Sequence, residues 1–123
     1  MPTIVHFDIA SEDPTRAKNF YEALFDWKMM SPPGYEDYYL VETEDAEGKP
    51  GLGGGLGKRG DPSQRITMYV GVDSVDEYIS KIEKLGGKTV SPKMTVPGYG
   101  YLVTCMDTEG NTFGIWQPET GAK

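Results

Sequence analysis

The stretch His6–Phe25, HFDIASEDPTRAKNFYEALF, decides the fold class of this chain. It opens with alternating apolar and polar residues, which is typical of a β-strand with one buried face. Asp13 can then cap a helix, and Pro14 suits its first turn. We expect this helix to end near Phe25 and to pack an apolar stripe on a sheet. The stripe consists of Ala17, Phe20, Tyr21 and Leu24.

A second stretch, Thr67–Leu85, repeats this order of strand and capped helix about sixty residues later. Short strand-like runs follow both copies. In the first half they are Trp27–Met30, Tyr38–Thr43 and the glycine-dense Gly51–Lys58, and in the second Lys88–Ser91, Tyr99–Met106 and Thr112–Trp116. The repetition predicts an α+β fold of two βαβββ repeats, at about residues 1–60 and 61–123. We expect a single domain whose curled mixed sheets surround a shared cleft.

Alternation also predicts which side chains of the second repeat face its core. The inward set is Ile66, Met68, Val70 and Val72 on the strand, and Val75, Tyr78, Ile79, Ile82 and Leu85 on the helix. Asp73 or Ser74 is expected to cap that helix, and Gly86–Gly87 to end it. Thr67 and Tyr69 then face away from the helix.

The composition restricts the partners of the chain. With 123 residues and a net charge of −7, it presents a surface that repels phosphate backbones and anionic lipids. We therefore expect no nucleic-acid or membrane partner. Much of the acid falls in one segment, which we interpret as a solvated hairpin edge, with a cation-binding patch as the alternative. Its members are Glu36, Asp37, Glu42, Glu44, Asp45 and Glu47.

The single cysteine, Cys105, excludes an intramolecular disulfide and suits a reducing compartment. The N-terminal sequence lacks the features of a secretory signal, and no apolar run approaches the ~20 residues that span a bilayer. We therefore expect a soluble cytoplasmic protein. Cys105 itself lies in a strand away from basic residues, which favours a buried, unreactive thiol.

Three features together resemble the vicinal oxygen chelate superfamily, which includes glyoxalase I, bleomycin resistance proteins and extradiol dioxygenases. They are HFDIASEDPTRAKNFY, the Val72–Asp73 strand-to-helix junction, and the closing hairpin DTEGNTFGIW. The resemblance implies a divalent metal held by side chains of the first and last strands of each repeat. His6 matches one such position, whereas Thr67 and Gly114 stand where many members have His and Glu.

These departures predict that the family's metal site is incomplete here. A divalent ion normally takes at least three protein ligands, and hard ions prefer carboxylate oxygens. His6 offers one imidazole, Asp8 on the same strand face could add one carboxylate, and the run Gly51–Gly57 adds none. We therefore expect no cofactor and no metal.

His6 and Asp8 are the candidate catalytic residues. One interpretation makes His6 a hydrogen-bonded cavity residue; the other makes it a general base whose ring is oriented by Asp8 or by a tyrosine. Aromatic side chains could sandwich a flat ligand, or could instead fill a dimer interface or the core between the repeats. The predicted ligand-binding cleft comprises His6, Asp8, Thr67, Tyr69, Gly114 and Trp116, with Tyr38, Tyr99 and Tyr101 as further candidates.

Three functions remain open at this point. The first is a homodimeric protein that binds an aromatic or amphipathic small molecule without a complete metal site. The second is a lyase, isomerase or dioxygenase-type enzyme that uses His6 as a base or as a partial metal ligand. The third is an interaction domain whose cleft is filled by side chains.

Overall fold

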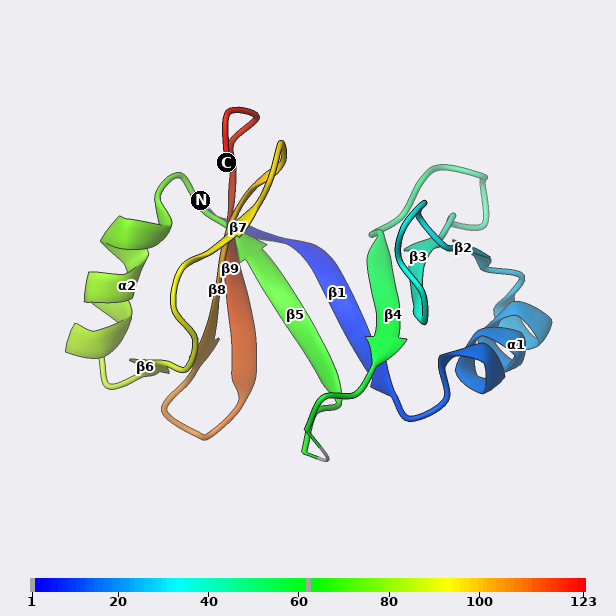
Figure 1. The fold of residues 1–123 in the computed structure, drawn as a ribbon, viewed down its shortest axis with the longest axis horizontal. Helices are drawn as coiled ribbons and strands as arrows, with labels where there is room; N and C mark the ends of the chain where they lie inside the picture. Colours follow the sequence, from blue (N-terminus) through cyan, green and yellow to red (C-terminus); the bar gives the residue numbers. More distant parts are fainter. Residues whose placement is uncertain (1, 62) are drawn as a thin grey trace. The chain divides into compact units, whose positions relative to one another are not determined.

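The computed structural model describes residues 2–61 and 63–123, and the chain divides into two compact units. The first unit is His6–Thr67. The second unit consists of two segments, the described N-terminal residues 2–5 and Met68–Lys123. Both boundaries fall inside strands, β1 (Thr3–Ser11) and β5 (Ile66–Gly71) (Figure 1). Each unit is described separately below.

The first unit contains one helix and a mixed sheet with strand order β2-β3-β4-β1. The first and last strands, β1 and β4, run parallel, and the remaining pairs are antiparallel. After β1 the elements are α1 (Pro14–Phe25), β2 (Lys28–Met30), β3 (Tyr38–Glu42) and β4 (Gly54–Lys58).

The second unit repeats this topology, with strand order β5-β9-β8-β6 and a parallel pairing of its first and last strands. After β5 the elements are α2 (Val75–Lys84), β6 (Lys88–Thr89), β7 (Met94–Val96), β8 (Gly100–Met106) and β9 (Thr112–Pro118). The short strand β7, which pairs with β8, was not expected from the sequence. The prediction of an α+β fold with two βαβββ repeats is confirmed.

Helix α1 begins as the sequence predicts. The Asp13 side chain accepts a hydrogen bond from the Arg16 amide at 3.1 Å, and Pro14 is the first helical residue. The predicted apolar stripe is only half correct, because Phe20 and Leu24 are 58% and 57% exposed. Two other members of the stripe, Ala17 and Tyr21, pack against the buried cluster. Ala17 and Tyr21, four residues apart, therefore face the sheet, whereas Phe20 and Leu24 lie on the adjacent side of the helix and do not.

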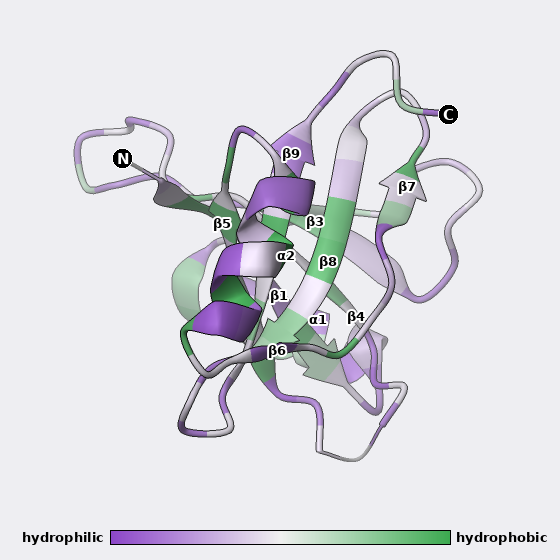
Figure 2. Ribbon diagram, turned by 90° about the vertical axis from the view of Figure 1, so that its left-hand side faces the viewer, coloured by the Kyte–Doolittle hydropathy of each residue, from purple (hydrophilic) through white to green (hydrophobic). Residues whose placement is uncertain are grey.

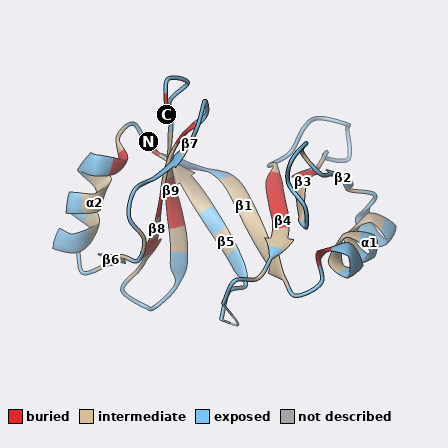
Figure 3. Cartoon of the chain, viewed as in Figure 1, coloured by how far each residue is buried: buried red, intermediate tan, exposed pale blue. Residues whose placement is uncertain are grey.

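The core of the first unit lies between α1 and its sheet. Met29, Val41 and Leu56 are its buried residues, and Figure 3 shows the first part of β4 as buried. Burying one such side chain contributes about 1.5–3 kcal/mol. Half-buried hydrophobic residues surround the three: Phe7, Ile9, Ala17, Tyr21, Trp27 and Tyr39.

The second unit has an equivalent core between α2 and the strands β8 and β9. Its buried residues are Val72, Val75, Val103, Cys105 and Ile115. In Figure 2, α2 carries mainly hydrophilic residues on its visible turns, and β8 carries hydrophobic stretches. Ser74, one of the two expected caps, accepts a hydrogen bond from the Glu77 amide at 3.2 Å.

Three of the side chains predicted to face this core do not. Ile66 and Met68 are 64% and 45% exposed, since the contacts of β5 with the buried cluster begin at Val70. Leu85 is 78% exposed because α2 ends at Lys84. Gly86 then turns the chain with a φ of +98°, a conformation that glycine adopts readily.

Candidate functional site

The face of the first unit's sheet opposite α1 carries the polar residues of β1. His6 and Asp8 project there, because the alternating Phe7 and Ile9 pack into the core. The His6 Nε2 atom lies 3.0 Å from Asp8 Oδ1, and both side chains are about one-third exposed. The sequence spacing alone left this contact open, and the structure forms it.

Tyr38 joins this pair from β3. Its hydroxyl group donates a hydrogen bond to Asp8 Oδ1 at 3.4 Å, so one carboxylate oxygen serves both Tyr38 and His6. Burial of the phenol, followed by the negative charge of Asp8, raises the pKa of Tyr38 well above its ordinary value. The phenol therefore remains protonated, and a donor, throughout the physiological pH range.

Glycines of β4 leave room for this group. Asp8 is the register partner of Gly55, and Tyr38 is the partner of Gly57. A Cβ atom on Gly55 would collide with the Tyr38 hydroxyl and would lie 2.6 Å from Asp8 Oδ1. Tyr38 can lie across β4 only because this strand lacks side chains there.

A tyrosine and a glycine also meet on the sheet of the second unit. Tyr69 pairs with Gly114, and Gly71 pairs with Trp116, so Tyr69 and Trp116 share a face. That face points away from the core, because Ile115, which lies between Gly114 and Trp116, is buried in the core. The predicted common orientation of the two aromatic side chains is thus found.

Two further aromatic candidates are placed differently from Trp116. Tyr101 packs against the buried cluster of the second unit, so its assignment to the cleft face is wrong. Its neighbour Leu102, not Tyr101, is the register partner of Trp116. Tyr99 precedes β8 and is 70% exposed.

The six predicted cleft residues divide between the units. The first unit holds His6, Asp8 and Thr67; the second holds Tyr69, Gly114 and Trp116. His6 and Asp8 share the face of the first unit's sheet away from α1, and Tyr69, Gly114 and Trp116 share the face of the second unit's sheet away from α2. Their joint participation in one cleft stays a prediction.

Comparison with known proteins assigns the family. A family model described as "Glyoxalase-like domain" matches residues 4–116. This chain is a glyoxalase-like domain. A "Glyoxylase-like domain-containing protein" of Didymella fabae is 30% identical over 115 residues, which cover 88% of both chains. A "Putative glyoxylase" of Mycobacterium bovis is 27% identical over 119 residues, covering 89% of this chain but 43% of that protein. The domain therefore spans less than half of the mycobacterial relative.

Solved structures show the same fold at low sequence identity. A glyoxalase/bleomycin resistance protein/dioxygenase superfamily member from Vibrio splendidus aligns with a TM-score of 0.70 and 10% identity. The alignment covers 97% of this chain and 100% of the Vibrio chain. A methylmalonyl-CoA epimerase from Streptomyces coelicolor aligns with a TM-score of 0.67 and 14% identity, covering 98% and 97%. These matches show the fold, and together with the family model over residues 4–116 they confirm the resemblance drawn from the sequence.

The residues of this glyoxalase-like domain do not fit the metal site that the family resemblance implies. Gly114 has no side chain that could ligate a metal, and the space beside it is filled, because a Cβ atom there would enter the ring of Tyr69. The described residues contain no group of three or more His, Cys, Asp or Glu side chains arranged to hold a metal ion. The described residues also contain no helix with both the length and the apolar character needed to cross a membrane.

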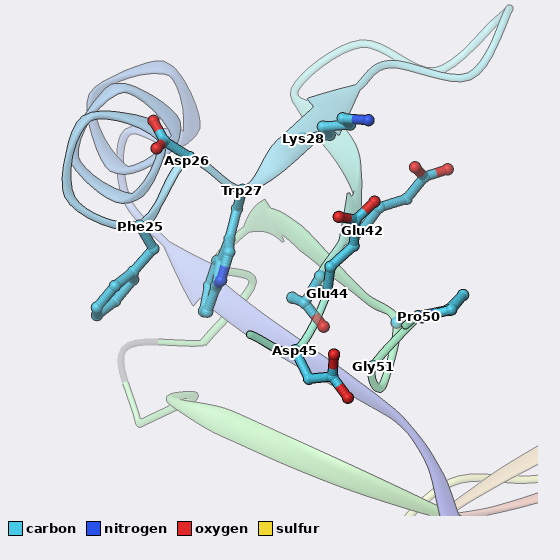
Figure 4. Close-up of a pocket in the computed structure, with 11 residues that line it drawn as sticks. Phe25, Asp26, Trp27, Lys28, Glu42, Glu44, Asp45, Pro50 and Gly51 are labelled. Atoms are coloured by element: carbon cyan, nitrogen blue, oxygen red, sulfur yellow. The ribbon is translucent and has the colours of Figure 1, made fainter. Parts of the chain in front are cut away.

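The first unit also contains a pocket that sequence reasoning did not identify. It has a volume of about 530 Å³ and lies beside the end of α1 and the loops that follow β3 (Figure 4). None of the six predicted cleft residues lines it. The lining residues are Phe25, Asp26, Trp27, Lys28, Glu42, Thr43, Glu44, Asp45, Pro50, Gly51 and Gly53. Three of its acids belong to the segment that the sequence marked as a hairpin edge or a cation patch.

Proposed function

We propose that this glyoxalase-like domain binds a small aromatic or amphipathic molecule without a complete metal site. One observation carries the proposal: His6 and Tyr38 share the Asp8 carboxylate on a partly exposed sheet face, next to the glycines of β4. This group offers both hydrogen-bond donors and an acceptor at fixed positions, which is what orients a bound ligand. Tyr69 and Trp116 supply flat apolar surfaces that can stack on a ring.

The proposal extends to assembly and location. We expect a homodimer, because an exposed sheet edge favours pairing with a second copy, and we expect the protein to act in the cytoplasm. Light scattering on the purified protein measures the assembly directly. A monomer at all concentrations would remove the dimer from the proposal without touching the ligand site.

A ligand screen by thermal shift tests the binding function. A compound present at 100 times its dissociation constant should stabilise the folded protein by about 2.7 kcal/mol. For any hit, Trp116→Ala and Tyr69→Ala should each weaken binding about threefold to tenfold, since each removes an aromatic contact. Thr67→Ala removes only a small, non-aromatic side chain of the predicted cleft, so it should scarcely change the affinity. Unchanged affinity in both aromatic variants would defeat the assignment.

The alternative function is a lyase, isomerase or dioxygenase-type enzyme. It is favoured by the 3.0 Å contact between His6 and Asp8, because a carboxylate beside an imidazole orients the ring for proton transfer. His6 would then accept a proton from the substrate, or would act as a partial metal ligand. A methylmalonyl-CoA epimerase among the structural neighbours shows that this fold supports an isomerase.

Elemental analysis of protein purified without chelators separates the two functions. Stoichiometric Fe, Mn, Ni or Zn that is lost in His6→Ala would favour the metal-dependent enzyme. Metal-free protein that turns over a bound compound, and loses turnover but not affinity in His6→Gln, would favour His6 as a base. Ligand binding without turnover or metal would leave the binding function as the conclusion.

A further inference from the structure

The pocket beside α1 has a wall made of an immobilised aromatic ring. Trp27 stacks on Tyr21 with ring centroids 5.2 Å apart and 14° between the planes, and it contacts Phe25 at the same centroid distance. Phe7 lies on the same ring at 6.4 Å. Because three rings hold Trp27, its orientation at the pocket is fixed before any ligand arrives, which reduces the entropic cost of binding.

The pocket is also strongly acidic. Asp26, Glu42, Glu44 and Asp45 line it, and Lys28 is the one basic residue among its eleven lining residues. Figure 4 shows the carboxylates of Glu42, Glu44 and Asp45 along one side of the pocket and Trp27 along the other. Asp45 Oδ1 already accepts hydrogen bonds from the amides of Glu47 and Lys49, so part of its charge serves the turn. Lys28 is the register partner of Glu42 and offsets part of its charge, so the charge available to a ligand comes from Asp26, Glu44 and the remainder of Glu42.

The end of α1 adds to this negative potential. The carbonyl end of a helix carries roughly half a negative charge, which a basic side chain in the last turn commonly offsets. The last turn of α1 contains no basic residue. Asp26 instead closes the helix in a left-handed conformation, with its amide bonded to the Glu22 carbonyl. The helix therefore presents its uncompensated negative end beside the carboxylates of the pocket.

We propose that this pocket binds an organic cation, a primary to quaternary ammonium group attached to an aromatic or aliphatic body. The ammonium group would lie over the face of Trp27, where the ring quadrupole attracts it, with Glu42 and Glu44 as its counter-charges. A volume of about 530 Å³ is within the usual size of a small-molecule site. An aromatic wall suits an organic cation better than a metal ion, which needs converging donor atoms. This site shares no residue with the one proposed above.

Benzyltrimethylammonium is a suitable probe, with benzyl alcohol as a neutral ring and tetramethylammonium as a charge without a ring. Binding is followed by the ¹H–¹⁵N NMR signals of the intact chain, in which Trp27 and Trp116 each give a separate indole signal. We expect saturable shifts of the Trp27 indole with benzyltrimethylammonium and binding of benzyl alcohol at least about tenfold weaker. Raising the salt from about 20 mM to about 300 mM should weaken the cation severalfold.

Two variants and their controls decide the proposal. Glu42→Gln combined with Glu44→Gln should weaken the cation about fivefold or more, whereas Glu83→Gln on α2 should leave it unchanged. Glu42, Glu44 and Glu83 are all exposed, so none of these changes should prevent folding. Trp27→Leu should remove most of the ring-dependent affinity, and if that variant does not fold, the double glutamine variant still decides.

Several results would overturn the proposal. They are no saturable shift with the cation, equal affinity for benzyl alcohol, an unchanged affinity in the double glutamine variant, or shifts centred on Trp116 in place of Trp27. Tyr69→Ala and Trp116→Ala keep this pocket intact, so they should not change cation binding. Failure of the ligand site proposed above can therefore be told apart from failure of this one.

Discussion

The ring of Tyr69 occupies the space that a Cβ atom on Gly114 would need. The two residues are register partners in the parallel pair of β5 and β9. The corresponding pair in the first unit is Asp8 and Gly55, with Tyr38 laid over the same glycine. In both repeats, therefore, a glycine of the last strand supports a polar or aromatic side chain on the open face.

Gly114→Ala should destabilise the protein by about 1–3 kcal/mol, because the added methyl group must displace Tyr69. Urea unfolding followed by circular dichroism measures this change. Gly53→Ala is the matched control, since the nearest atom to a Cβ atom there is the Val41 carbonyl oxygen at 3.6 Å, an ordinary contact. Tyr69→Ala combined with Gly114→Ala should recover part of the loss. Equal stability of the two single variants would contradict the overlap.

Tyr38 should make the stability sensitive to alkaline pH. Its pKa is raised in the folded state, so its contribution is complete below the unfolded value of about 10 and is lost as the pH rises beyond that value. Wild-type protein should therefore lose more stability between about pH 9 and pH 11 than Tyr38→Phe does. Tyr39→Phe, whose hydroxyl bonds Thr15 at an exposed position, is the control and should follow the wild type. Parallel curves for the wild type and Tyr38→Phe would reject this role.

Cys105 should react slowly with thiol reagents in the native protein. It is fully buried, and burial raises the pKa of its thiol, so little thiolate forms at neutral pH. Labelling with Ellman's reagent should be about a hundredfold or more slower in buffer than in denaturing urea, where one thiol per chain should react. Rapid stoichiometric labelling of the native protein would show that the core of the second unit opens easily.

The two units should unfold together, as the prediction of one domain requires. Leu56 and Val103 are completely buried in the cores of the first and second unit, respectively. Leu56→Ala should cost about 2–5 kcal/mol and Val103→Ala somewhat less, because each leaves a cavity. Each change should shift one common transition, measured by tryptophan fluorescence and by far-ultraviolet circular dichroism. Two separated transitions would show that the units fold independently.

Local patterns in the sequence predicted the elements well. The repeat, the Asp13 cap and the end of α1 at Phe25 all depend on residues a few positions apart. The same patterns overestimated burial at Phe20, Leu24 and Leu85, because periodicity gives the direction of a side chain and not the area that the opposing layer covers.

The candidate site shows the same limit. Alternation placed His6 and Asp8 on one face, but the bond from Tyr38 to Asp8 joins residues thirty positions apart and depends on strand pairing. The prediction that Tyr101 faces the cleft was wrong, because Tyr101 alternates in phase with the buried residues Val103 and Cys105 and therefore points to the core. The pocket beside α1 combines Trp27 with acids from a distant loop, which no local signal connects.

The bare backbone of β4 restricts how this gene can change. Any missense mutation of a glycine codon adds atoms, and at Gly54 the first added carbon would lie 2.5 Å from the Phe7 carbonyl oxygen. Gly55 has the same relation to Tyr38. During divergence, a larger residue at Gly54 or Gly55 is therefore tolerated only after Phe7 or Tyr38, respectively, has become smaller or moved. Paired substitutions in β4 and in the side chains that contact it are thus the route by which descendants of this sequence can acquire a differently shaped face.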